Sequence, residues 1–149
     1  LLSTSERMHE GFPIHRYLLV SSLLFVPPIV RFLRNPIKNK TEIVLCSLLN
    51  RNYILSNLFW SNPIQNSMIH TYDAFFARIS ILFFTPYVLG WKPIALKLKI
   101  LYFLILVSMY LSFHRGHHFS SREWCSIQHI KYHMIFHIFT SMGCSIAFL

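Results

Sequence analysis

Residues 94–113 read IALKLKILYFLILVSMYLSF, and after the two lysines this stretch is almost entirely apolar. A helix of about 20 residues, rising about 1.5 Å per residue, covers the hydrocarbon layer of a bilayer, which is about 30 Å thick. In lipid, backbone polar groups must be hydrogen-bonded within the protein, and a helix satisfies this requirement. The stretch therefore predicts a transmembrane helix.

The composition of the whole chain agrees with a membrane protein. It has 149 residues, 54% of them hydrophobic and 13% charged, with fourteen phenylalanines and four glycines. The formal net charge is +9, but the basic residues are dispersed and form no Lys/Arg-rich block, which argues against nucleic-acid binding. The three cysteines, Cys46, Cys125 and Cys144, form no CxxC pair and favour neither a disulfide framework nor a thiolate zinc site.

Four further apolar stretches lie at about 14–34, 43–60, 70–90 and 126–149. Together with 94–113 they predict one all-α transmembrane domain over residues 1–149, a polytopic bundle of four or five spans with short loops. Pro27-Pro28 should kink the first stretch or end its regular part. The first two stretches could instead form a kinked or re-entrant pair.

Two patterns predict helix starts. SSRE places Ser120 as N-cap with Glu123 at the third helical position, which is a capping box. NPIQ places Asn62 as N-cap with Pro63 at the first helical position. Helix stops are expected at Asn35-Pro36 and at 90–93. Trp60, Trp91 and Trp124 fall at predicted span ends, as in an aromatic belt.

Alternation of the spans places the loops 61–72 and 114–127 on one side of the membrane. The opposite side carries seven of the fourteen Lys and Arg residues, with Glu42 as its one acid: Arg31, Arg34, Lys38, Lys40, Lys92, Lys97 and Lys99. By the positive-inside rule the basic side faces cytosol, matrix or stroma, and the histidines face the other compartment. We expect an integral protein of an intracellular organelle membrane.

Six of the nine histidines lie between residues 113 and 137. His129, His133 and His137 are spaced four apart and share one face of a helix, and His70 and Asp73 share a face of another. His70 and His129 should both lie ~12 Å into their helices, so the two sets can meet at one level.

Three imidazoles and a carboxylate suit zinc or iron, and catalytic zinc takes three protein ligands and a water. The predicted ligands are His70, His129 and His133, with Asp73 as a further ligand or as the group that orients water. His137 is a secondary candidate. The alternative is that interfacial histidines simply bond to headgroups, carbonyls or tyrosine hydroxyls.

HIKYH, residues 129–133, resembles the HxxxH element of the CREST superfamily, which includes alkaline ceramidases and progestin/adiponectin-type receptors. Members also carry a Ser and a His at the end of an earlier span and an Asp in the next. Ser56 and Asp73 match that pattern, whereas Trp60 stands where the His would follow. The chain also has five predicted spans where the family has seven. The resemblance implies a zinc-dependent hydrolase acting on a lipid amide, with Ser56 stabilising the oxyanion.

HRGHH, residues 114–118, is similar to the HxxHH box of membrane desaturases, but the third histidine box of those enzymes is missing. His114, His117 and His118 are therefore secondary metal candidates, and we expect them in a solvated surface loop. Haem or chlorophyll, each of which takes a single axial His, are alternative cofactors. They would suit a non-catalytic accessory subunit of a respiratory or photosynthetic complex.

Arg51 and Arg78 lie within predicted spans. A lone arginine in hydrocarbon costs at least ~2.5 kcal/mol, so each should face the bundle or another membrane subunit. Asp73 is the acidic residue at membrane depth, and it could serve as the structural counter-ion of Arg51 instead of a metal ligand. The sequence thus predicts membrane lipids and other membrane subunits as partners, and it leaves the hydrolase and the accessory subunit as competing functions.

Overall fold

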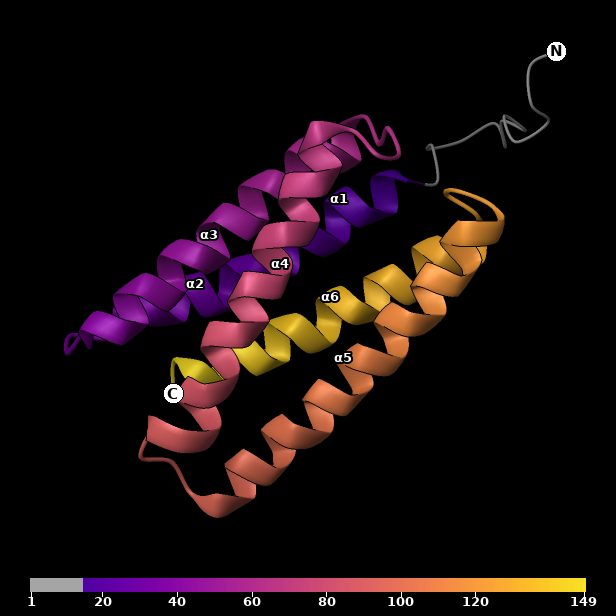
Figure 1. Cartoon of the computed structure of the whole chain (residues 1–149). Coiled ribbons are helices and arrows are strands. Elements are labelled where there is room, and N and C mark those ends of the chain that lie inside the picture. Colours follow the sequence, from indigo (N-terminus) through magenta and orange to yellow (C-terminus); the bar gives the residue numbers. More distant parts are fainter. Residues whose placement is uncertain (1–14) are drawn as a thin grey trace, which may run out of the picture.

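The computed structural model describes residues 15–149, and all regular structure in that range is helical, as predicted (Figure 1). Ile14, the first residue of the first predicted stretch, lies outside the described residues. A helix occupies each of the five apolar stretches, and two of these helices change type within their length. The elements are α1 (Arg16–Ser22), the 3-10 turn η1 (Leu23–Phe25), α2 (Val26–Arg34), α3 (Lys40–Ser61), α4 (Met68–Pro86), the π-helical turn η2 (Tyr87–Trp91), α5 (Leu96–Arg122) and α6 (Ile127–Ala147).

Three helical segments of the described chain are long and apolar enough to cross a membrane: Arg16–Arg34, Met68–Trp91 and Leu96–Arg122. They are consistent with an integral membrane protein. The middle of α3 is polar at 50–52, and the first half of α6 carries Lys131 and three histidines. A bundle with four or five crossings therefore stays a prediction for these two helices.

The proline pair interrupts the first helix as the sequence indicates. Proline has no backbone N–H, so Pro28 cannot donate to the carbonyl of Leu24. The chain passes through the 3-10 turn η1 just before the prolines and then resumes as α2. The carbonyl of Leu24 instead accepts a hydrogen bond from Ser141 Oγ on α6. The carbonyl that the proline leaves free thus links η1 to α6.

Both predicted helix starts are wrong. Helix α5 continues to Arg122, and the Ser120 hydroxyl donates to the carbonyl of His117 at 2.9 Å, near the end of that helix. Asn62 is the C-cap of α3. The next helices begin later, after the N-caps Ser67 and Ser126. The continuation of α5 is favoured by its packing along α6, where Gly116 lies close enough for a Cβ to approach Tyr132 at 3.6 Å.

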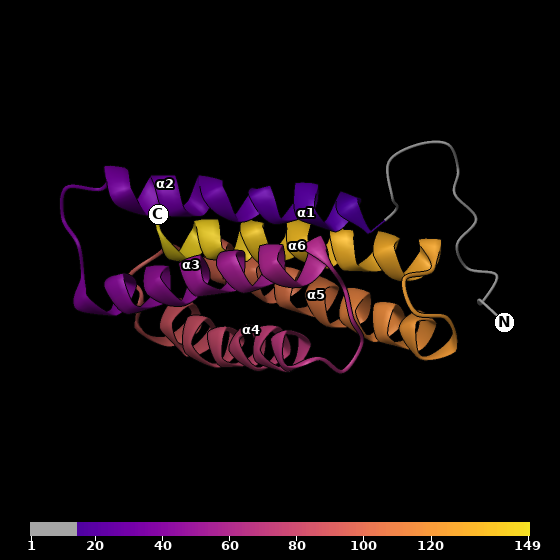
Figure 2. The same cartoon turned by 90° about the horizontal axis from the view of Figure 1, so that it is seen from above.

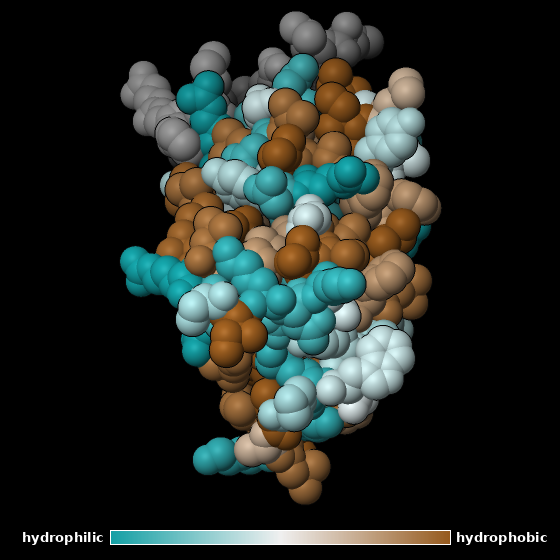
Figure 3. All heavy atoms as spheres, turned by 90° about the vertical axis from the view of Figure 1, so that its left-hand side faces the viewer, coloured by the Kyte–Doolittle hydropathy of each residue, from teal (hydrophilic) through white to brown (hydrophobic). Residues whose placement is uncertain are grey.

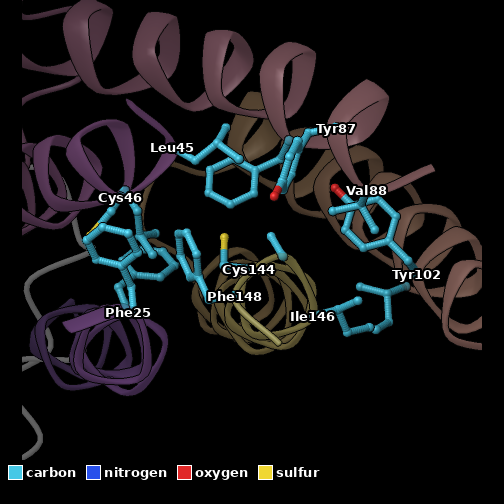
Figure 4. Packing of buried hydrophobic residues seen from close by; sticks show 14 of the residues in the cluster. Phe25, Leu45, Cys46, Tyr87, Val88, Tyr102, Cys144, Ile146 and Phe148 are labelled. Carbon is cyan, nitrogen blue, oxygen red and sulfur yellow. The ribbon is translucent and has the colours of Figure 1, made fainter. Parts of the chain in front are cut away.

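Helix α6 lies in the middle of the bundle, between α1–α2 on one side and α5 on the other (Figure 2). Its C-terminal end carries Cys144, Ile146 and Phe148 into the largest buried cluster. Side chains from the surrounding elements pack around them, including Phe25, Leu45, Tyr87, Val88 and Tyr102 (Figure 4).

The two ends of the bundle are each closed by a polar contact. At one end Lys92 Nζ and Glu42 Oε1 form a buried ion pair of 2.6 Å, and Tyr87 also donates to Glu42 at 2.6 Å. Figure 3 views the molecule from this side, where hydrophilic side chains gather between apolar ones. At the other end Trp124 Nε1 donates to the carbonyl of Pro63 at 3.2 Å. The loops 62–67 and 123–126 therefore meet, as the alternation of helices requires.

Candidate functional site

A cavity of about 510 Å³ lies between the four long helices. Helix α4 packs along α3, and α5 packs along α6. The two helix pairs separate with distance from the connection between α4 and α5 (Figure 1). Eight of the predicted site residues line this cavity: Ser56, His70, Asp73, Arg78, His117, His129, His133 and His137. The structure thus brings most of the predicted set around one space.

The remaining predicted residues lie elsewhere. His114 and His118 are exposed on α5 and do not line the cavity. The expectation of a loop at His114, His117 and His118 is wrong, because all three belong to the last turns of α5. Arg51 is also outside the cavity, on the exposed side of α3.

Two histidines at this site complete helix caps. Ser67 Oγ accepts a hydrogen bond from the backbone N–H of His70 at 3.2 Å, and His70 Nδ1 accepts one from the N–H of Asn66 at 3.0 Å. Ser126, His129 and Cys125 repeat this arrangement at 3.3 Å and 3.3 Å. The arrangement is similar to a capping box, with an imidazole in place of the usual Glu or Gln, but the ring accepts from the residue before the N-cap and not from the N-cap itself.

These caps decide which ring nitrogen carries the proton. A backbone N–H can only donate, so Nδ1 of His70 and of His129 is the acceptor, and in the neutral ring the hydrogen is on Nε2. A metal ligand needs a free lone pair, and in this arrangement neither ring offers one. Both residues are therefore poor ligands, although each lines the cavity at the level that the sequence predicts.

His137 differs from these two. Its Nδ1 lies 2.8 Å from Ser21 Oγ, and the Ser21 hydroxyl donates to the carbonyl of Leu18 at 3.1 Å. Since that hydroxyl has a single hydrogen, His137 Nδ1–H is the donor to Ser21, and Nε2 keeps its lone pair. His133 contacts other rings and makes no hydrogen bond within residues 15–149.

The donor set does not fit a zinc site well. Of the three histidines on one face of α6, His133 and His137 keep a free ring lone pair, and their ring centroids are 4.9 Å apart. Across the described part of the chain, no group of three or more His, Cys, Asp or Glu side chains is arranged to hold a metal ion. The zinc site remains a prediction that these residues do not favour.

Trp60 and Trp124 line the cavity and contact its histidines, a role that was not predicted from the sequence. The Trp60 ring lies 5.0 Å from the ring of His133 and is 1% exposed. The Trp124 ring contacts both capping histidines, at 5.3 Å from His70 and 5.0 Å from His129. Of the three tryptophans assigned to an interfacial belt, Trp91 is the exposed one, at 75%. Trp60 follows Ser56 by four residues and therefore lies on the same face of the helix, which was the sequence signal that could have placed it at the site.

Polar atoms without a partner follow one face of α3. Asn52, Ser56 and Trp60 are spaced four apart, are 9%, 3% and 1% exposed, and line the cavity. Asn52 Oδ1, Ser56 Oγ and Trp60 Nε1 have no hydrogen-bond partner within residues 15–149. Asn52 Nδ2 does have one, donating to Ser80 Oγ at 2.6 Å. We call these three residues the α3 stripe.

Asp73 and Arg51 do not pair. The Arg51 guanidinium lies over the ring of Phe76, 4.7 Å from its centroid. Asp73 lines the cavity and makes no hydrogen bond or ion pair with another described residue. The interpretation of Asp73 as the structural counter-ion of Arg51 is therefore wrong, because the α4 ring of Phe76 and not the carboxylate meets the cation.

Comparison with models of known protein families gives no match, and comparisons with curated proteins and with solved structures give none either.

Proposed function

We propose that the chain is a non-catalytic membrane subunit whose cavity binds a lipid-like molecule. The observation that carries the proposal is the cavity between α4 and α5, about 510 Å³ in volume, with unpartnered polar atoms on one wall. Ligand sites commonly enclose roughly 300–1,000 Å³ and combine apolar walls with a few placed polar groups. The remaining walls are largely apolar and include Leu106, Met109 and Phe136.

The mouth of the cavity supports entry from the lipid side. Arg78 on α4 and Tyr110 on α5 line the cavity and are also exposed. Each lies near the middle of a helix that is long and apolar enough to cross a membrane. Their neighbours on the outer surface are apolar, for example Leu82 at 71% exposed and Phe103 at 56%. A molecule that enters between α4 and α5 thus comes from the hydrocarbon layer.

Arg51 supports the accessory part of the proposal. An exposed cation midway along a helix is costly against lipid at Arg51 as it is at Arg78, and the Phe76 ring offsets only part of that cost at Arg51. Another membrane subunit that covers α3 would remove it from the hydrocarbon. We propose an organelle membrane for this subunit, with the basic loops on its cytosolic, matrix or stromal side.

Lipid extraction tests the proposal. The full chain purified in detergent is expected to retain about one lipid per chain by native mass spectrometry. Ala77→Trp should fill the cavity and remove that lipid, because Ala77 lines it. Ala95→Trp, at an exposed connection, is the matched control. A wild-type chain without lipid, or retention by a folded Ala77→Trp variant, would contradict the proposal.

A zinc-dependent lipid amide hydrolase is the second candidate. The observation in its favour is that Ser56, Asp73 and His133 line the same cavity. About one zinc per chain, together with cleavage of an N-acyl sphingoid lipid that is lost in His133→Ala, would support it over the first. A Soret or chlorophyll absorption band in the purified protein would instead identify a pigment-binding subunit.

A further inference from the structure

We infer that the cavity selects a lipid with an uncharged head that both donates and accepts hydrogen bonds, a hydroxyl or an amide, and that the α3 stripe holds this head. The inference rests on the proposed function and names its ligand class. It begins from Asn52, Ser56 and Trp60, which line the same cavity, are each at least nine-tenths buried, and each carry a polar atom with no partner among the described residues.

Three unpartnered atoms in one row need an explanation. Buried polar groups are nearly always hydrogen-bonded, so three exceptions on one helix face call for a partner that the described residues do not supply. Residues four apart on a helix are separated by about 6 Å along its axis, so the stripe extends over about 12 Å. A single head group can therefore meet two adjacent members of the stripe, and a hydrated or longer head can meet all three.

The atoms of the stripe define the complementary group. Asn52 Oδ1 only accepts, Trp60 Nε1 only donates, and Ser56 Oγ does both. An ester, ether or ketone offers acceptors alone and would leave Asn52 Oδ1 without a donor. A hydroxyl or an amide carries both functions and can satisfy Asn52 and Ser56, or Ser56 and Trp60, at once.

Charge excludes the other common heads. The stripe carries no formal charge, so a carboxylate or phosphate placed there would be buried without a cation. The charged residues that line the cavity are Asp73 and Arg78, both on α4. Arg78 is exposed at the mouth, and Asp73 would repel an anion. An ammonium head could meet Asp73, which makes a cationic amphiphile the alternative that the experiment must separate.

Brominated probes measure the selectivity, because bromine quenches tryptophan fluorescence at short range and Trp60 lies in the site. The full chain carrying Trp91→Phe, which removes the exposed tryptophan, is titrated in detergent with 9,10-dibromo-octadecanol, the corresponding acid, amine and methyl ether. We expect the alcohol to bind about tenfold more tightly than the ether and the acid, the ratio that one unmatched buried hydrogen bond produces.

Variants locate the head. Ser56→Ala and Asn52→Leu should each weaken binding of the alcohol about tenfold, and Asn52→Leu should leave the ether unchanged, because an ether has no hydrogen to donate to Asn52 Oδ1. Ser61→Ala and Asn50→Leu, at exposed positions of the same helix, are the matched controls. If Asn52→Leu does not fold, because it also removes the bond to Ser80, Ser56→Ala decides alone.

Equal affinity for alcohol and ether, or a Ser56→Ala variant that binds the alcohol as wild type does, would overturn the inference while leaving a lipid cavity in place. The tightest binding of the amine, lost in Asp73→Asn, would replace it by a cation site. Absence of quenching by every probe would instead overturn the proposed function itself.

Discussion

His70 and His129 occupy the same position of two different helices: each is the third residue after a serine N-cap, and each Nδ1 accepts the backbone N–H four residues earlier. The two caps lie at one end of the bundle and contact the same ring, that of Trp124. The relationship gives both histidines a structural role, since each imidazole takes a place at the third helical position that a capping box gives to Glu or Gln.

Substitution of the capping histidine should therefore follow hydrogen-bonding capacity. His129→Ala is expected to lower the free energy of unfolding by about 1 kcal/mol, the usual value of such a cap, and Ser126→Ala by a similar amount. His129→Gln restores an acceptor at the third helical position and should recover most of the loss. Unfolding in mixed detergent measures these differences.

His118→Ala is the matched control, since His118 is exposed on α5 and makes no cap. If His129→Gln were as unstable as His129→Ala, the imidazole would act through something other than its acceptor nitrogen.

The backbone at Cys125 gives a second prediction. Cys125 has φ 57° and Asn66 has φ 61°, each just before a serine N-cap. The left-handed region costs most non-glycine residues about 1–2 kcal/mol, whereas Asn tolerates it better. Cys125→Gly should therefore raise the thermal midpoint, and Asn66→Gly should change it less. A lower midpoint for Cys125→Gly would show that contacts of the thiol outweigh the backbone strain.

The ion pair between Glu42 and Lys92 is buried, and its loss should be costly. Lys92→Met leaves a buried carboxylate with Tyr87 as its remaining side-chain partner, and we expect a loss of about 3–5 kcal/mol. The double variant Glu42→Leu/Lys92→Met should recover most of that loss, because apolar residues can replace a buried pair nearly neutrally. Chemical unfolding of the three proteins at pH 7 provides the comparison.

The same pair predicts a pH dependence. Burial opposes ionisation of Glu42, but hydrogen bonds from Lys92 and Tyr87 and the charge of Lys92 lower its pKa overall. An unfolded glutamate, with a pKa of about 4.3, then binds its proton before the folded one as the pH falls. Stability from the pair is present above about pH 4.3 and lost below it. The free energy of unfolding of the double variant Glu42→Leu/Lys92→Met should therefore fall less steeply than that of wild type as the pH drops below about 4.3.

Two serines near the stripe should respond differently to removal of the hydroxyl. Ser80 Oγ accepts from Asn52 Nδ2, so Ser80→Ala leaves a buried donor unpaired and is expected to cost about 1–3 kcal/mol. Ser56 Oγ has no partner among the described residues, so Ser56→Ala in delipidated protein should be neutral or slightly stabilising. A large loss in Ser56→Ala would mean that the hydroxyl is satisfied in the free protein.

The apolar stretches were enough to predict the helices, because about 20 apolar residues have few other stable conformations in lipid. The helix starts were not predictable by the same rules. SSRE matches a capping box more closely than Ser126-x-x-His129 does, yet packing along α6 carries α5 past Ser120. A local pattern of four residues is outweighed by the contacts of a whole helix.

The candidate site was likewise predictable from the sequence only in part. Helical periodicity placed His129 and His133 on one face and predicted His70 at their level, and all three line the cavity. Which atoms of those rings are free depends on backbone N–H groups at Asn66 and Cys125, whose conformation the sequence did not reveal. The α3 stripe was hidden because Trp60 at a span end also suits an aromatic belt.

The number of crossings is open to a direct test, because α3 and α6 are not among the three segments that are long and apolar enough to cross a membrane. If all five helical segments cross, the connections 35–39 and 92–95 lie on one side of the membrane and 62–67 and 123–126 on the other. In a background without the natural cysteines, Lys38→Cys and Ser121→Cys, both exposed, should react with a membrane-impermeant maleimide from opposite sides of sealed vesicles. Residues 38 and 121 are separated by three helices, α3, α4 and α5, so they lie on opposite sides if all three cross. If both cysteines react from one side, one of the three helices or all three fail to cross. Since Met68–Trp91 and Leu96–Arg122 are apolar enough to cross, that result would identify α3, with its exposed Arg51, as the helix that lies outside the hydrocarbon.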